Sequence, residues 1–184
     1  MYKIVTIDKD IVNEIENVLT SPYFGWFFQT NSYDEPFPKS YFTKNCVDSF
    51  QLTHVFKQGP HNIDNNSPYF YLIPKLLKAA NLNVKTLFRA KANFNVANVR
   101  QKSNQHKAPH TDVFEPEYPN WYTFLYYVNE SDGDTLFFDK KFKIIKRVSP
   151  QRGKAVLFRN DLLHAAQNPK KNPYRIIINI VVSE

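Results

Sequence analysis

The spacing of apolar residues along the sequence changes near residue 84. Before that point, apolar residues recur every three or four positions in two stretches, which is the spacing of one face of a helix. The first predicted helix begins at a capping aspartate, Asp8 or Asp10, runs to Leu19 and ends before Ser21 and Pro22. We expect one side of this helix to cover an apolar core.

The second predicted helix begins at Ser67 and Pro68, which suit an N-cap and a first helical position. It runs toward Ala80, and Pro74 is expected to kink or restart it. Between the two helices the sequence is aromatic, polar and irregular, with one predicted strand over residues 49–56.

After residue 84 the pattern consists of short strand-like runs separated by turns. Eight such runs predict strands over residues 86–98, 108–114, 121–129, 134–139, 142–148, 154–160, 162–168 and 174–182. Evenly spaced strands without helices between them favour a mainly β fold, a double-stranded β-helix or jelly roll, with the N-terminal helices packed against one sheet. We expect a single domain over residues 1–184, in which residues 1–83 form a helical and loop support and residues 84–184 form the jelly-roll core.

Composition says more about the compartment in which the protein folds than about its function. A chain of 184 residues can bury a core without disulfides, and its single cysteine, Cys46, suits a reducing compartment. No apolar run approaches the length that spans a bilayer, so we expect a soluble, cytoplasmic protein without a membrane partner.

The net charge is positive but the basic residues are scattered. The 24 basic and 17 acidic residues give a formal charge of +7, which favours polyanions or acidic substrates in general. A solvated basic surface explains this distribution better than a nucleic-acid footprint does, although a nucleic-acid partner remains an alternative.

Candidate chemistry begins with His110 and Asp112, two positions apart in a predicted strand. Side chains at i and i+2 point to the same face, so the imidazole and the carboxylate would lie side by side. His164 follows on the seventh strand-like run, which a double-sheet fold can place beside the second. Two imidazoles and one carboxylate form the facial triad of Fe(II) sites with open positions, and zinc is an alternative.

Arg175 is the second candidate, because it lies in the last predicted strand. Both faces of residues 174–182 are apolar enough to be buried, and a buried guanidinium requires an anion. No acidic residue in the neighbouring runs stands out as its partner, so a ligand carboxylate is a candidate. The alternative is that Arg175, at the start of the strand, reaches solvent.

The order His110, Asp112, His164 and Arg175 resembles the iron(II)/2-oxoglutarate-dependent dioxygenases, within them the prolyl 4-hydroxylase-like group that also occurs in phages. The resemblance covers roughly residues 84 to 182. It implies that the triad binds Fe(II) and that Arg175 pairs with a carboxylate of the cosubstrate 2-oxoglutarate. By the same resemblance, three further residues would contact the cosubstrate: Tyr127, Leu136 and Asn179.

The resemblance also implies a reaction, in which dioxygen and 2-oxoglutarate are consumed and a hydroxylated substrate and succinate are formed. It favours prolyl residues in a peptide or protein as substrate. The pocket walls are then expected from residues 21–67 and from the loop over residues 113–122, where Trp121 and Tyr122 would pack against a proline ring. Alternatives are an oxygenase acting on a nucleic acid or small metabolite, and a metal-free jelly-roll binding module.

Overall fold

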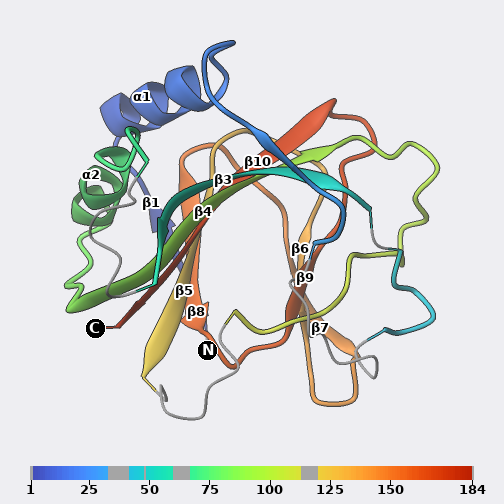
Figure 1. The fold of residues 1–184 in the computed structure, drawn as a ribbon. Helices are drawn as coiled ribbons and strands as arrows, with labels where there is room; N and C mark the ends of the chain where they lie inside the picture. Colours follow the sequence, from blue (N-terminus) through green and yellow to red (C-terminus); the bar gives the residue numbers. More distant parts are fainter. Residues whose placement is uncertain (1, 33–41, 48, 60–66, 113–119, 184) are drawn as a thin grey trace.

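The computed structural model describes residues 2–32, 42–47, 49–59, 67–112 and 120–183. Over these residues the molecule has three layers (Figure 1). Two helices lie on one side of a large, curved sheet, and a small sheet with the labels β6, β7 and β9 lies on its other side.

Both sheets are antiparallel throughout. The large sheet has seven strands in the order β1 (Tyr2–Thr6), β8 (Lys154–Arg159), β5 (Trp121–Tyr127), β10 (Tyr174–Ser183), β4 (Thr86–Val96), β3 (Gln51–Gln58) and β2 (Phe27–Gln29). The small sheet has three, in the order β7 (Ile144–Val148), β6 (Thr135–Phe138) and β9 (His164–Ala166). The mainly β, jelly-roll class predicted from the alternating pattern is confirmed.

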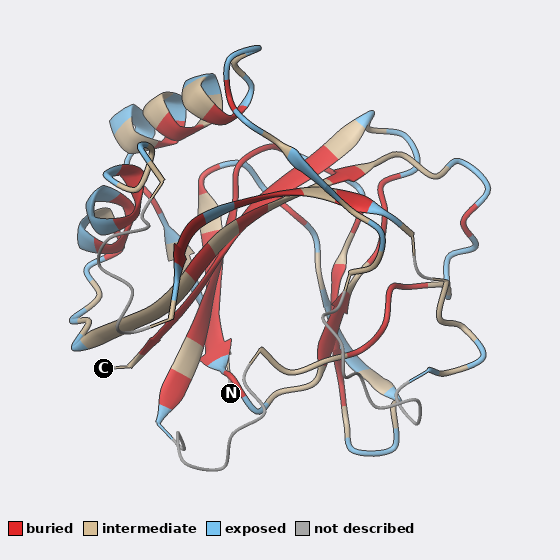
Figure 2. Ribbon diagram, in the orientation of Figure 1, coloured by how far each residue is buried: buried red, intermediate tan, exposed pale blue. Residues whose placement is uncertain are grey.

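The two helices cover the face of the large sheet that turns away from the small one. Helix α1 (Lys9–Leu19) begins where the carboxylate of Asp8 accepts a hydrogen bond from the Asp10 amide. Its buried residues, and those of α2 (Leu72–Ala79), share one core with the side chains that β4, β5, β8 and β10 turn toward the helices. Figure 2 shows this as buried stripes on the helix sides that face the sheet. No helix in the described part of the chain is long and apolar enough to cross a membrane.

Helix α2 begins later than the sequence predicts. The amide of Phe70 donates to the Ser67 carbonyl at 2.8 Å, and the amide of Ile73 donates to that of Phe70 at 2.9 Å, so the first residues form tight turns. Pro74 explains the delay, because it has no N–H to donate to the carbonyl four residues earlier and its ring crowds that carbonyl. The regular helix therefore begins at Leu72, with Pro74 in its first turn.

Several strand predictions need correction. Residues 108–112, the described part of the run 108–114, form no strand, and only His110 makes a bridge, to His164. Pro109 lacks an amide hydrogen, and the partner strand β9 has only three residues, so a longer ladder cannot form here. Strands β1 and β2 were not predicted, since both are short edge strands; with β3 they join residues before 84 to the large sheet. The division of a single domain at residue 84 stays a prediction.

Strand β10 separates the two larger apolar cores of the described structure, as its two apolar faces predict. Ile176, Ile178 and Ile180 lie in the core beneath the helices, whereas Ile177 lies in the core between the sheets. Arg175 shares the face of Ile177 and is only 2 % exposed. The charged end of its side chain is therefore held between the sheets.

Candidate metal centre

His110 and His164 are brought together by their own backbones. The amide of each donates to the carbonyl of the other at 2.9 Å, and their ring centroids lie 4.6 Å apart. The Nδ1 of His110 lies 2.9 Å from the Ala108 carbonyl, and that of His164 lies 3.0 Å from the Leu162 carbonyl. A carbonyl only accepts, so both Nδ1 atoms carry the hydrogen and both Nε2 atoms present a lone pair.

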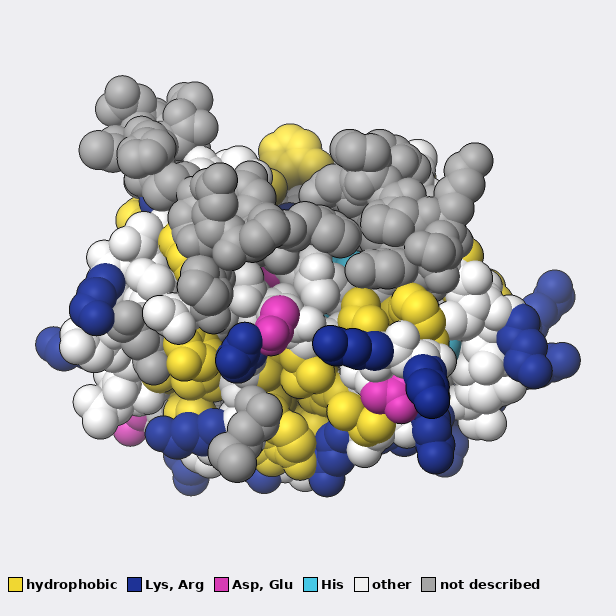
Figure 3. Space-filling view, turned by 90° about the horizontal axis from the view of Figure 1, so that it is seen from below, with side chains coloured by type: hydrophobic (Ala, Val, Ile, Leu, Met, Phe, Trp, Pro, Cys, Tyr) yellow, Lys and Arg dark blue, Asp and Glu magenta, His cyan; other side chains and the backbone are white. Residues whose placement is uncertain are grey.

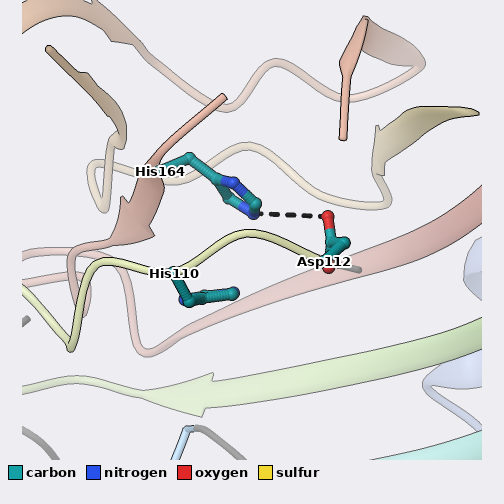
Figure 4. A group of neighbouring side chains, drawn as sticks. All are labelled: His110, Asp112 and His164. Carbon is teal, nitrogen blue, oxygen red and sulfur yellow. Dashed lines mark ion pairs between the residues drawn. The ribbon is translucent and has the colours of Figure 1, made fainter. Parts of the chain in front are cut away.

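Asp112 completes a group of ligand atoms. Its side chain is 2 % exposed, and its Oδ2 lies 3.4 Å from His164 Nε2. One ligand atom from each of His110, Asp112 and His164 lies within 4.8 Å of the other two. Figure 4 shows the three side chains directed at one another, with the dashed line joining Asp112 and His164. Two nitrogens and one oxygen on one side of a common point suit Fe(II) with open positions, and they also suit zinc.

The ionisation of these side chains favours metal binding at neutral pH. Burial, followed by the neighbouring His164, lowers the pKa of His110 to about 4, so its imidazole is neutral. Burial alone would raise the pKa of Asp112, but its electrostatic interactions with His164 and with the Arg89 guanidinium hold it well below its usual range. A neutral imidazole and an ionised carboxylate are the forms that bind a metal ion.

Three donors from the large sheet hold Asp112. Arg89 on β4 donates to Oδ1 at 2.7 Å, Asn179 on β10 donates to Oδ1 at 3.0 Å, and Thr123 on β5 donates to Oδ2 at 2.6 Å. Neither Arg89 nor Thr123 was singled out from the sequence. The alternation along β4, where Arg89 and Asn95 share the face opposite Ala90, carried a signal for a polar, site-facing side of that strand.

Arg175 lies in the same cavity as the two histidines, between the sheets. Its guanidinium donates to two neutral oxygens, Asn95 Oδ1 at 3.4 Å and Thr135 Oγ1 at 2.9 Å, and its buried Nε has no partner. It makes no ion pair with any acidic residue in the described ranges. Burial lowers its pKa, which is the electrostatic sign of a charge without a close counter-ion.

The residues expected to contact a cosubstrate differ in their positions. Tyr127 lies beside Arg175, whose guanidinium carbon is 5.8 Å from the ring centroid. Asn179 lines the cavity but gives its amide hydrogen bond to Asp112. Leu136 packs with Phe138 on the opposite face of β6 from Thr135, which does line the cavity. The cosubstrate roles of all three stay predictions.

Trp121 and Tyr122, expected to contact a substrate, point to opposite sides of β5. Trp121 is 8 % exposed, lies edge-on to Phe88 at 5.2 Å and shares the side of Thr123. Tyr122 packs against the core beneath the helices instead. Of the two, only Trp121 lies on the side of the metal-binding residues.

Comparisons with known proteins agree with this geometry. Residues 94–182 match the family model of the 2OG-Fe(II) oxygenase superfamily, where 2OG is 2-oxoglutarate. The sequence matches no curated protein at a significant level.

Similar solved structures share the fold at low sequence identity. A prolyl-4-hydroxylase from Pseudomonas putida has a TM-score of 0.61 at 12% identity, covering 100% of this chain and 92% of that one. A prolyl hydroxylase from Trichoplax adhaerens, in complex with a peptide fragment of the hypoxia inducible factor oxygen degradation domain, has a TM-score of 0.59 at 12% identity, covering 99% and 83%. The alpha-ketoglutarate-dependent epimerase SnoN from nogalamycin biosynthesis has a TM-score of 0.57 at 13% identity, covering 100% and 78%.

These neighbours carry out different reactions on the same architecture, so the fold does not specify the substrate. The family match is more specific, since it spans β5 to β9 and nearly all of β10, and therefore includes the histidines, the aspartate and the buried arginine. Residues 94–182 of this chain thus match the model of the 2OG-Fe(II) oxygenase superfamily, whose members require Fe(II), 2-oxoglutarate and dioxygen.

Proposed function

We propose that the protein is an Fe(II)- and 2-oxoglutarate-dependent hydroxylase that acts on prolyl residues of a peptide or protein. His110, Asp112 and His164 hold the iron, and Arg175 pairs with the carboxylate of 2-oxoglutarate that is distant from the metal. Tyr127 and Thr135 orient Arg175, and the chain acts as a single domain.

The observation that carries this proposal is the unpaired charge of Arg175. Its guanidinium is buried, has only neutral oxygens as described partners, and opens into the cavity that contains His110 and His164. A carboxylate that accepts two N–H bonds from a guanidinium is its best partner. The cosubstrate of the superfamily is a dicarboxylate, so one end can meet the metal while the other meets Arg175.

The residues of the chain divide the work of this reaction between them. Bound iron with 2-oxoglutarate and dioxygen supplies the oxidising power that converts a C–H bond into C–OH and releases succinate and carbon dioxide. The two histidines present Nε2 lone pairs, and Asp112 contributes a negative charge. Leu125 and Ile177 form apolar parts of the cavity wall and limit its water content.

The structural neighbours support a peptide substrate. One is a prolyl hydroxylase bound to a peptide, and another is a bacterial prolyl-4-hydroxylase. Trp121 lies on the side of β5 that faces the metal-binding residues, but its ring packs edge-on against Phe88 and is only 8 % exposed, so its contact with a proline ring stays a prediction. Residues 33–41 and 113–119, from which further walls were expected, lie outside the described residues.

A small metabolite is the second candidate, because the epimerase neighbour belongs to a biosynthetic pathway for a small molecule. A nucleic-acid substrate has less support. Among the described residues on the face seen from below, Figure 3 shows Lys and Arg side chains spread around hydrophobic ones and not gathered into one continuous basic patch. A footprint on a phosphate backbone calls for such a patch.

The test is incubation of the iron-loaded protein with 2-oxoglutarate and separate panels of proline-containing peptides, oligonucleotides and amino acids. We expect succinate together with a mass gain of one oxygen in a peptide, and loss of both with Arg175→Met. Hydroxylation of free amino acids or oligonucleotides, without a peptide product, would replace the peptidyl substrate with the second class. Absence of any succinate in all panels would contradict the oxygenase itself.

A further inference from the structure

Three neighbouring strands of the large sheet donate hydrogen bonds to one carboxylate, that of Asp112. Arg89 comes from β4, Asn179 from β10 and Thr123 from β5, and these strands lie in the order β5, β10, β4. Asp112 itself lies outside any strand. Its orientation is therefore set by the sheet beneath it and not by its own segment.

The strand register explains how the donors converge. Val181 in the central strand pairs with Arg89 on one side and with Thr123 on the other. Asn179 lies two residues before Val181, on the same face. The three donors thus form a triangle whose corners are fixed by backbone pairing, and the carboxylate of Asp112 rests on it.

A count of lone pairs shows what this triangle leaves free. An ionised carboxylate offers about four acceptor positions, two on each oxygen. Oδ1 accepts from both Arg89 and Asn179, whereas Oδ2 accepts only from Thr123. The free position is on Oδ2, the oxygen that lies 3.4 Å from His164 Nε2.

We propose that Arg89 is a positioning residue that keeps Asp112 a one-oxygen metal ligand. This inference rests on the proposed function, in which His110, Asp112 and His164 hold the metal. With Oδ1 engaged by a cation and an amide, only Oδ2 would be available to a metal ion, which would leave room beside the three protein ligands for the cosubstrate. A carboxylate released from Arg89 could offer its second oxygen to the metal as well and would then compete with the cosubstrate.

The proposal predicts that the affinity for the metal and the affinity for 2-oxoglutarate respond differently to substitution of Arg89. Arg89→Met removes a charge that opposes the metal, so binding of the metal alone does not weaken. Binding of 2-oxoglutarate to the metal-loaded protein does weaken, because one of its two coordination positions is now contested. If Arg89 served folding alone, its substitution would not selectively weaken 2-oxoglutarate binding while metal binding is kept.

The experiment uses Mn(II) as the probe ion, which avoids oxidation. Calorimetric titration first measures Mn(II) binding to the chelator-treated protein, and then 2-oxoglutarate binding to the Mn(II)-loaded protein. For Arg89→Met we expect Mn(II) affinity within about threefold of the parent, or tighter, and 2-oxoglutarate affinity lower by about tenfold or more, the scale of one charge-assisted hydrogen bond. Arg89→Lys keeps a charged donor and is expected to recover most of that loss.

Arg159→Met is the matched control, because Arg159 makes an exposed ion pair with Asp161 at 2.8 Å. This variant is expected to leave both affinities unchanged. Parental 2-oxoglutarate affinity in Arg89→Met overturns the positioning role. So does a joint loss of Mn(II) binding and thermal stability, which indicates a structural residue. If Arg89→Met does not fold, Arg89→Gln, which keeps a neutral polar side chain, takes its place in the same test. Mn(II) binding that is unaffected by His110→Ala overturns the proposed function instead.

Discussion

Arg175 and Tyr127 share one acceptor, the hydroxyl oxygen of Thr135. Arg175 Nη2 and the Tyr127 hydroxyl each donate to Thr135 Oγ1 at 2.9 Å, and the guanidinium carbon lies 5.8 Å from the Tyr127 ring centroid. The arginine is thus held by a neutral oxygen and an aromatic ring, which fix its direction without neutralising its charge. Its charge is left for a ligand.

Removal of this charge is expected to weaken cosubstrate binding. In Arg175→Met, the affinity of the Mn(II)-loaded protein for 2-oxoglutarate should fall by about 2 to 4 kcal/mol, the scale of a desolvated, charge-assisted pair. Titration calorimetry measures it. Arg152→Met is the control, since Arg152 binds Glu16 in the half-exposed contact with α1. Unchanged affinity in Arg175→Met would place the carboxylate partner elsewhere.

Removal of one histidine is expected to empty the metal centre. His110→Ala takes away one of three ligand atoms, and the remaining pair is a poor site for a divalent ion. Elemental analysis after purification should find metal in the parent and almost none in the variant. Asp161→Asn is the control, because Asp161 is an exposed carboxylate that pairs with Arg159. Equal metal content in His110→Ala and the parent would refute the triad.

His54, on the helix side of the large sheet, is expected to matter for stability. Its Nδ1 lies 2.6 Å from the Gly25 carbonyl and its Nε2 lies 2.7 Å from the Ser67 hydroxyl, within a group of aromatic rings. His54→Ala removes one hydrogen bond each from the Gly25 carbonyl and the Ser67 hydroxyl and opens a cavity, so the free energy of unfolding should fall by about 2 to 4 kcal/mol. Urea unfolding of the metal-free protein measures this. A loss below about 0.5 kcal/mol, the level of a neutral surface change, contradicts it.

Acidification is expected to destabilise the metal-free protein. Burial is the largest cause of lowered pKa values at His54, His106 and His110, the last to about 4. The unfolded chain then binds more protons than the folded one, so this stability is fully present above pH of about 6.5 and is lost as the pH falls toward the folded values. The lowered pKa of Asp112 acts in the same direction at still lower pH.

The expected slope is about 1.4 kcal/mol per pH unit for each extra proton bound on unfolding. Urea unfolding at a series of pH values between neutral and about pH 5 gives the slope directly, over the range where an ordinary histidine protonates. A free energy of unfolding that stays constant over this range is the contrary result. Bound metal should raise the curve by a nearly constant amount over this range and lose that effect at lower pH, because it binds the deprotonated form of the ligands.

Two glycines are expected to resist substitution to different degrees. A Cβ at Gly133 would lie 2.5 Å from the Gln167 carbonyl oxygen, whereas one at Gly153, where φ is +76°, would lie 2.9 Å from Val12 Cγ2. Backbone atoms cannot move aside as a valine methyl can, so Gly133→Ala should cost about 3 kcal/mol and Gly153→Ala about 1 to 2 kcal/mol. Thermal unfolding of the two variants compares their losses of stability. Gly25→Ala, with ordinary contact distances, is the control and should change little.

The predictions from the sequence were most accurate where local pattern decides structure. The alternation of residues 174–182 predicted two buried faces for β10, and the capping aspartate predicted the start of α1. The order of the two histidines, the aspartate and Arg175 along the chain predicted that these residues would lie close together. In the structure His110, His164 and Arg175 line one cavity, and Asp112 lies beside His164. These features depend on neighbours in sequence or on a pattern of residue types.

Features that depend on long-range pairing could not be predicted in this way. Arg89 and Thr123 approach Asp112 only because both pair with Val181, and nothing near any of them in sequence indicates it. A segment such as residues 108–112 alternates like a strand but has almost no partner to pair with, so periodicity alone does not distinguish it from one.

The backbone bridge between His110 and His164 ties the two imidazoles to one opening event. Each residue protects the amide hydrogen of the other, so both hydrogens exchange with solvent only when the pair separates. Deuterium uptake at these two positions should therefore rise and fall together. A bound metal that joins the rings should slow the exchange of both amide hydrogens by the same factor. The exchange rate of these two amides therefore reports the occupancy of the metal site without any substrate.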